Sequence, residues 1–246
     1  MFSRNQPVIP QHQQAKLAEI TLLCAGAGMG SAICELAART GVRRFIIADG
    51  DEVELSNLNR QSYARADIGK NKAESVARRL ASIDPEIEVD VLPVYLQERE
   101  LREYIPRATA VVNTIDFDDE NFQRCSDLCR KFGKLELFAT NLGFGGSVAC
   151  FLPNSPTLSE RFGTTDHRQL KRRILDFLLI ENPQSPAYIR ELYAEYLRTP
   201  PERDPQTGIS TWLNAAMVVN ALVRYGCGEE IRVFPEIYYA DFNGSQ

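Results

Sequence analysis

Short apolar runs alternate along this chain with longer segments whose apolar residues recur every three or four positions. Such runs are typical of strands buried on both faces of a parallel sheet, and the longer spacing is typical of amphipathic helices. Strands are predicted at 20–24, 45–48, 87–92, 110–114, 135–140, 147–152 and 231–239. Helices are predicted at 31–39, 70–83, 96–105, 122–132 and 209–225.

This alternation predicts an α/β chain with a Rossmann-like, doubly wound and mainly parallel sheet. Two segments depart from the pattern. Residues 1–19 are polar and rich in glutamine, which predicts an N-terminal arm leading into a short helix. Residues 153–207 hold several prolines and a basic, helically spaced stretch, which predicts a helical insertion or cap. The length of 246 residues fits one domain, 1–246.

Composition and charge exclude several classes of protein. The net charge of −5 gives no basic field for nucleic acid. The longest apolar stretch, 215–223, is too short to span a bilayer. No Cys-x-x-Cys pair occurs among the six cysteines, so a four-thiolate zinc site has no support, and the N-terminus lacks the plan of a signal peptide. We expect a cytoplasmic protein with neither a nucleic-acid nor a membrane partner.

A glycine turn, Gly26-Ala27-Gly28-Met29-Gly30, lies between the first predicted strand and the first long helix. Backbone without Cβ atoms can approach a phosphate closely, and a helix N-terminus offers free N–H groups and partial positive charge. Asp49 ends the next strand, where dinucleotide folds place a ribose-binding carboxylate. The alternative is a turn that only packs closely. Taken as a ligand site, Gly26, Gly28, Gly30 and Asp49 fit NAD and ATP equally well.

The segment that follows favours ATP. Polar amides, Arg60 and Lys72 come soon after the predicted ribose carboxylate. An arginine can bind phosphate oxygens with two parallel hydrogen bonds, and a lysine adds a point charge. Considered alone, Arg60 or Lys72 could also be an ordinary charged residue on the solvated surface. Together they suit a triphosphate under attack better than a dinucleotide held by its glycine loop.

The run D-x-D-x-V-E-x-S-N-L-x-R-Q at 49–61, followed by G-x-x-K at 69–72, resembles the ThiF/MoeB/ubiquitin-activating superfamily. The resemblance is specific over 20–92 and recognisable to 152. Members use ATP to adenylate a carboxylate, usually the C-terminus of a ubiquitin-like or sulfur-carrier protein. The resemblance therefore implies ATP-dependent transfer of AMP to a carboxylate substrate, with release of pyrophosphate and with Mg²⁺ as cofactor.

The resemblance also implies roles for residues of the motif. Asp49 would hold the adenosine ribose. Asp51 would support the site through the metal or the nucleotide. The phosphates would be contacted by Asn57, Arg60 and Lys72.

Two further roles are implied outside the motif. Asp116 matches the aspartate that binds magnesium in the family, and a hard carboxylate is what Mg²⁺ requires. The arm Phe2-Ser3-Arg4-Asn5-Gln6 is similar to the family's Tyr-Ser-Arg-Gln arm, whose arginine reaches into the partner subunit's ATP site. Arg4 is therefore expected to act in trans in a homodimer.

The chain departs from the family pattern in several places. Ala25 and Ala27 stand where the family keeps glycine, and we expect each to add a Cβ where the backbone nears the phosphates. The family's zinc cysteines are missing, and its crossover segment is replaced by the basic helical insertion. We interpret Cys150 and Cys227 as structural residues, and we therefore expect adenylation without a covalent thioester.

Other readings stay open. An NAD(P)-dependent oxidoreductase would use the same fold, although His12 and His167 lie outside the predicted Rossmann core. A non-catalytic nucleotide-binding subunit would keep the fold without turnover. The stretch 141–146 fits a hairpin turn and a place where an acceptor chain approaches the backbone about equally. The acyl substrate is also open between a ubiquitin-like protein, a peptide and a small molecule.

Overall fold

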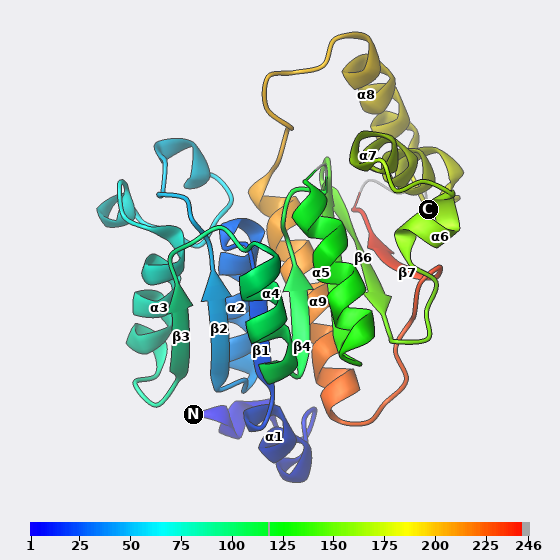
Figure 1. Cartoon of the computed structure of the whole chain (residues 1–246). Coiled ribbons are helices and arrows are strands. Elements are labelled where there is room, and N and C mark those ends of the chain that lie inside the picture. Colours follow the sequence, from blue (N-terminus) through cyan, green and yellow to red (C-terminus); the bar gives the residue numbers. More distant parts are fainter. Residues whose placement is uncertain (118, 243–246) are drawn as a thin grey trace.

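The computed structural model describes residues 1–117 and 119–242. Within them, the strands form a single sheet in the order β3-β2-β1-β4-β5-β6-β7 (Figure 1). The pairs from β3 to β5 are parallel, whereas β5–β6 and β6–β7 are antiparallel. The strands span Thr21–Ala25 (β1), Arg44–Ala48 (β2), Glu88–Leu92 (β3), Ala110–Asn113 (β4), Leu135–Leu142 (β5), Gly145–Phe151 (β6) and Ile237–Ala240 (β7). The predicted Rossmann-like, mainly parallel sheet is confirmed.

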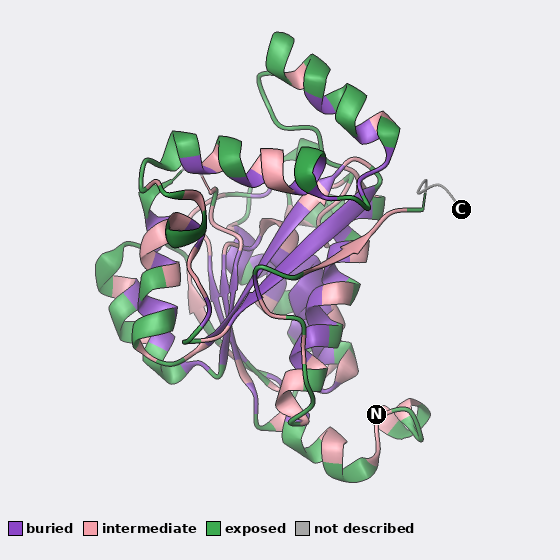
Figure 2. Ribbon diagram, turned by 90° about the vertical axis from the view of Figure 1, so that its right-hand side faces the viewer, coloured by how far each residue is buried: buried purple, intermediate pink, exposed green. Residues whose placement is uncertain are grey.

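Helices cover both faces of this sheet. Successive side chains of β1 point to opposite faces and therefore join two different hydrophobic clusters. Leu22 and Cys24 join the cluster formed with α2 (Gly28–Thr40), α3 (Lys72–Ile83) and α9 (Gly208–Gly226). Leu23 and Ala25 join the opposite cluster, formed with α4 (Glu98–Tyr104) and α5 (Glu120–Lys131). Figure 2 shows the result, with buried residues concentrated along the sheet and exposed residues on the outer helix faces.

The N-terminal arm lies at the amino end of the parallel strands, at the bottom of Figure 1. It consists of a 3-10 turn, Phe2–Asn5, and α1 (Gln11–Ala18). Asn5 Nδ2 donates to Gln14 Oε1 over 2.8 Å, and Gln14 Nε2 donates to the carbonyl of Thr40 over 2.8 Å. These bonds fix the arm to the last residue of α2.

The segment 153–207 lies at the opposite end of the sheet, above the carboxyl ends of the parallel strands (Figure 1). It contains α6 (Leu158–Phe162), α7 (His167–Asp176), a π-helical turn (Phe177–Glu181) and α8 (Ala187–Arg198). These helices share a third hydrophobic cluster with β5 and β6, made up of residues that include Leu170, Ile174, Leu179, Ile189, Tyr193, Phe138 and Phe151. The segment therefore packs onto the sheet rather than extending away from it.

The last predicted strand is shorter than expected. Residues 231–236 form an irregular segment, and only Ile237–Ala240 pair with β6. Pro235 interrupts the apolar run, and proline has no N–H to give to a strand ladder. In the antiparallel pair β5–β6, Leu142 pairs with Gly145 across a two-residue turn. The stretch 141–146 therefore forms a hairpin turn, one of the two structures that the sequence allowed for it.

Glu136 on β5 is a carboxylic acid in the core of the sheet, with 2% of its surface exposed. Its Oε1 accepts hydrogen bonds from Ser126 Oγ over 2.6 Å and from Asn113 Nδ2 over 2.8 Å. Burial raises the pKa of this carboxyl to about 7, because the low-dielectric interior disfavours the charged form and the two donors offset only part of that cost.

Glu136→Gln is expected to remove a pH dependence from the free energy of unfolding. The unfolded chain loses this proton near pH 4.5 and the folded chain near 7. The folded state therefore binds more protons between these values, and its stability falls by about 3 kcal/mol as pH rises through them. The amide cannot ionise. Urea unfolding between pH 4.5 and 7.5 checks this, with the exposed Glu88→Gln on β3 as control. An equally steep fall in wild type and Glu136→Gln contradicts the assignment.

Candidate functional site

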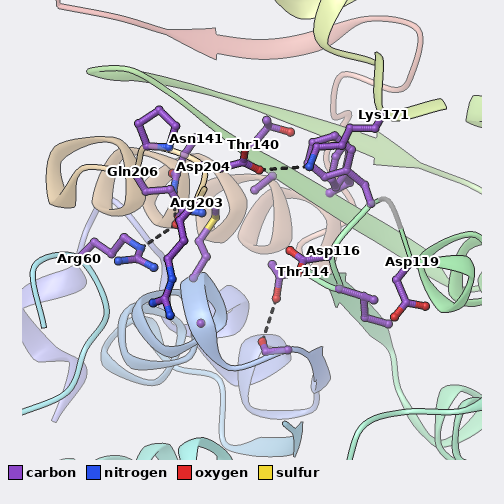
Figure 3. Close-up of a pocket in the computed structure, with 18 of the residues that line it drawn as sticks. Arg60, Thr114, Asp116, Asp119, Thr140, Asn141, Lys171, Arg203, Asp204 and Gln206 are labelled. Atoms are coloured by element: carbon purple, nitrogen blue, oxygen red, sulfur yellow. Dashed lines mark hydrogen bonds and ion pairs between the residues drawn. The ribbon is translucent and has the colours of Figure 1, made fainter. Parts of the chain in front are cut away.

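A cavity of about 960 Å³ opens at the carboxyl ends of the parallel strands, under α7 and α8 (Figure 3). Open α/β sheets bind ligands at this edge, and small-molecule sites occupy roughly 300–1,000 Å³. The structure brings most of the predicted site residues to its wall: Gly26, Gly28, Asp49, Asp51, Asn57, Arg60, Lys72 and Asp116. We call the first seven of these the polar wall.

The glycine turn opens helix α2 directly, since the helix begins at Gly28. Gly26 has φ +101°, a conformation that side-chain-bearing residues rarely adopt. The N–H groups of a first helical turn have no acceptor within the helix, so an anion can accept from them. Gly30 is not a cavity-lining residue. A Cβ there would lie 2.2 Å from Cys24 Sγ, so this glycine allows α2 to pack closely on β1.

Ala25 and Ala27 do not crowd the cavity. Both are buried, Ala25 in the cluster under α4 and α5 and Ala27 in the cluster under α2 and α9. The expectation that their Cβ atoms face the phosphates is therefore wrong. Their methyl groups point into the hydrophobic core and leave the cavity side of the turn to backbone atoms.

Asp49 ties the glycine turn to the end of β2. Its Oδ2 accepts from the N–H of Ala27 over 2.7 Å, and its Oδ1 accepts from the N–H of Asp51 over 2.8 Å. Burial raises the pKa of Asp49 above its usual value, although these two donors and the Lys72 ammonium favour the ionised form. The carboxylate thus fixes the shape of the turn.

Lys72 is the buried cation of the polar wall. Its Nζ lies 2.7 Å from Asp51 Oδ2, and the hydroxyl of Tyr95 donates to Asp51 Oδ1 over 2.5 Å. Burial works against ionisation of Asp51, but the hydrogen bonds from Lys72 and Tyr95 outweigh it and hold its pKa below the usual value. The pair keeps an ammonium in place at the start of α3.

Arg60 is the half-buried cation of the same wall. Its Nη1 donates to the carbonyl of Ser56 over 2.9 Å and to Asn59 Oδ1 over 2.8 Å. Asn57 Oδ1 accepts from the N–H of Glu54 over 2.9 Å, which closes the 3-10 turn Leu55–Asn57 just before this arginine. The local backbone therefore holds the guanidinium at the cavity.

The ThiF family model matches residues 2–241 of the sequence. The chain belongs to the ThiF family. It is 28% identical over 243 residues to the uncharacterized protein MT1398 of Mycobacterium tuberculosis, covering 94% of this chain and 33% of that protein. It is 34% identical over 164 residues to the sulfur carrier protein ThiS adenylyltransferase of Bacillus subtilis. That match covers 63% of this chain and 47% of that protein.

The crystal structure of Escherichia coli MccB with AMPCPP and MccA has a similar fold, with a TM-score of 0.66 and 19% identity. The match covers 99% of this chain and 72% of MccB. The chain spans between a third and about two fifths of the length of the first curated relatives it matches.

A second arginine faces the cavity of this ThiF-family chain from the segment 199–207, between α8 and α9. Arg203 lines the cavity, and its Nη1 donates to Glu54 Oε2 over 2.9 Å. From the same segment, Gln206 Oε1 accepts from Arg60 Nε over 2.7 Å (Figure 3). Burial and the nearby Arg203 charge lower the pKa of Arg60. Sequence reasoning missed Arg203, because no motif marks its proline-bounded segment.

Asp116 follows β4, and its exposed side chain lines the cavity, as does Asp119 (Figure 3). Within residues 1–117 and 119–242, no group of three or more His, Cys, Asp or Glu side chains could hold a metal ion. A carboxylate that shares Mg²⁺ with substrate phosphates needs no such protein cage. Asp116 and Asp119 offer carboxylate oxygens at this edge, which are the donors that Mg²⁺ prefers.

Three other predicted residues lie away from the cavity wall. Arg4 is exposed on the arm at the amino end of the sheet, so it faces away from the site of its own chain. Cys150 is buried in β6, and burial raises its pKa to about 12. Burial also raises the pKa of Cys227. A raised pKa leaves little thiolate, which is the nucleophilic form, so neither thiol is poised for a thioester.

Among the described residues, no helix combines the length and the apolar character needed to cross a membrane.

Proposed function

We propose that this chain binds ATP in the cavity and transfers AMP to a carboxylate substrate with release of pyrophosphate. The observation that carries the proposal is the polar wall, where one cavity collects the glycine turn, Asp49, Arg60 and Lys72. A helix N-terminus and two cations suit a polyphosphate. We also propose that residues 1–246 act as one adenylation domain, with 1–19 as its arm and 153–207 as the insertion that covers the cavity.

In this proposal the ribose lies at Asp49, and the phosphates lie over the turn from Gly26 to Gly28. Asp51 supports the site by holding Lys72. Arg60 and Lys72 contact the phosphate oxygens, and Asn57 shapes the turn that carries Arg60. Preorganised cations of this kind stabilise the charge that develops as the phosphate is attacked.

The substrate carboxylate needs no general base, because it is already ionised at neutral pH. One of its oxygens forms a bond to the α-phosphorus, the bond from that phosphorus to the bridging oxygen breaks, and the electron pair leaves with pyrophosphate. The products are an acyl adenylate and pyrophosphate. Catalysis consists of holding the reactants in line and stabilising charge. Asp116 would hold Mg²⁺, which would supply positive charge for the departing pyrophosphate.

The cavity supports this reading over the two alternatives. Neither His12 nor His167 lines the cavity, so neither histidine can serve an oxidoreductase there as acid or base. A non-catalytic subunit can bind a nucleotide through cations alone and has no need of a metal-binding carboxylate for turnover, yet Asp116 lines the same cavity as Arg60 and Lys72. The proposal also places the chain in the cytoplasm, where ATP is abundant and the six cysteines, all free thiols here, stay reduced.

ATP–pyrophosphate exchange with a panel of carboxylic acids tests the proposed function. Arg60→Ala and Asp116→Ala are each expected to lower exchange by at least about 100-fold, because each removes charge stabilisation at the reacting phosphates. Arg65→Ala, at an exposed arginine off the cavity wall, serves as the matched control with wild-type exchange. Full exchange in both site variants would reject the site assignment, and ATP binding without exchange for any acid would favour the non-catalytic subunit.

Arg203→Ala is expected to raise the KM for ATP about tenfold. Its bond to Glu54 joins two exposed side chains and is weak, so the guanidinium can turn to the phosphates, where a charge-assisted bond is worth about 1.5–3 kcal/mol. The control is Arg198→Ala at the exposed end of α8. Initial rates over a range of ATP concentrations separate KM from kcat. Equal KM values in the two variants contradict a phosphate contact by Arg203.

We propose that Arg4 acts in trans within a homodimer. Arg4→Ala and Arg60→Ala are each expected to be nearly inactive alone. Mixing them restores exchange, since a mixed dimer has one site that lacks both arginines and one that lacks neither. Random pairing of equal amounts returns about a quarter of wild-type activity. Refolding the two variants together, then assaying exchange, checks this. Mixtures no more active than their components contradict action in trans.

A further inference from the structure

The cavity continues beyond the polar wall into a part lined by large apolar side chains. They come from the loop after β4, from α7 and the π-helical turn, and from α8. We call them the apolar wall: Phe117, Leu175, Leu179, Leu192 and Tyr196. The ribose and phosphates, which the proposed function places at the polar wall, leave these side chains without an assigned ligand.

Leu192 is the informative member of the apolar wall. It is 45% exposed although leucine gains by leaving water, and it lines the cavity. Its neighbours Tyr193 and Ile189 on α8 also line the cavity, but they are buried in the cluster that packs on the sheet. Of these three, Leu192 is the one left exposed, and an apolar ligand group in the cavity can cover it.

A cation lies beside the apolar wall. Lys171 on α7 lines the cavity, and its Nζ lies 5.4 Å from the ring centroid of Phe117, the residue after Asp116. The ammonium also pairs with Asp204 Oδ2 over 3.2 Å, and Tyr196 donates to the same carboxylate over 2.8 Å. Figure 3 shows Lys171 and Asp116 on the side of the cavity away from Arg60. A carboxylate entering beside the apolar wall would share the Lys171 ammonium with Asp204, on the side of the cavity where Asp116 lies.

We propose that the substrate is a carboxylic acid with an apolar α-substituent, whose side group covers the apolar wall and whose carboxylate lies by Lys171. This inference rests on the proposed adenylation and names its substrate class. A Gly-Gly terminus has no side chain and would leave the wall in contact with water. The same chemistry occurs in a small N-acyl amino acid and at the end of a short peptide, and the test separates these two sources.

The first measurement is ATP–pyrophosphate exchange with N-acetylleucine, N-acetylphenylalanine, N-acetylglycine and N-acetylaspartate. Exchange with the first two is expected to exceed that with the last two by about 10- to 100-fold in kcat/KM, the range that an apolar pocket can discriminate. A pentapeptide ending in leucine is compared with N-acetylleucine: a higher kcat/KM for the peptide assigns the peptide source, and an equal or lower one assigns the small acid. Equal exchange with glycine and leucine overturns the inference.

Two variants separate the apolar contact from the charge. Leu192→Glu is expected to lower the leucine-to-glycine ratio at least tenfold while the KM for ATP stays constant. Leu197→Glu, on the same helix and 38% exposed but off the cavity wall, is the matched control that keeps the ratio. Lys171→Met is expected to raise the KM of every acid by a similar factor without changing their order. An unchanged ratio in Leu192→Glu overturns the role of the apolar wall.

Calorimetry in the presence of AMP distinguishes failure of this inference from failure of the proposed function. Tighter binding of N-acetylleucine than of N-acetylglycine, without exchange for either, would reject adenylation and keep the substrate class. Exchange with equal binding of the two acids would keep adenylation and reject the substrate class.

Discussion

The site depends on one carboxylate that joins two separate strands. Asp49 at the end of β2 accepts hydrogen bonds from the N–H of Ala27 and from the N–H of Asp51. The first bond sets the glycine turn before α2, and the second sets the loop whose next residues lead to Arg60 and Lys72. Because Asp49 is largely buried, these bonds act in a low-dielectric setting and cannot be exchanged cheaply for water. One side chain therefore shapes both the turn and the start of the cation-bearing loop.

The second constraint is the segment 153–207, which gives the cavity its far side. It packs on β5 and β6 through its own hydrophobic cluster and returns to α9 through the stretch that carries Arg203 and Gln206. The hydrogen bond between Gln206 and Arg60 links this stretch to the motif at 49–61. The polar wall thus comes from the Rossmann half of the chain, and the apolar wall comes mainly from the insertion.

Local patterns predicted the fold and most of the polar wall because both depend on neighbours in sequence. Buried strands appear in the sequence as apolar runs, and the residues that follow these runs lie at the carboxyl edge of the sheet. The pattern could not show where a side chain points at a strand–helix junction, so Ala25 and Ala27 were wrongly placed toward the phosphates. Nor could it find Arg203, because that residue reaches Glu54 across 149 positions of sequence. Contacts of such range follow from how helices pack, which no short motif records.

In the proposed reaction, the covering helices α7 and α8 would lengthen the lifetime of the acyl adenylate. An acyl adenylate is a mixed anhydride, and bulk water hydrolyses it. In a cavity with one polar and one apolar wall, the adenylyl half and the acyl half of the intermediate would be held at the same time, with the labile bond between them beneath α7. Shielding of this kind protects reactive species from side reactions. The insertion would then serve the second half of the reaction, by keeping the activated acid intact until its nucleophile arrives.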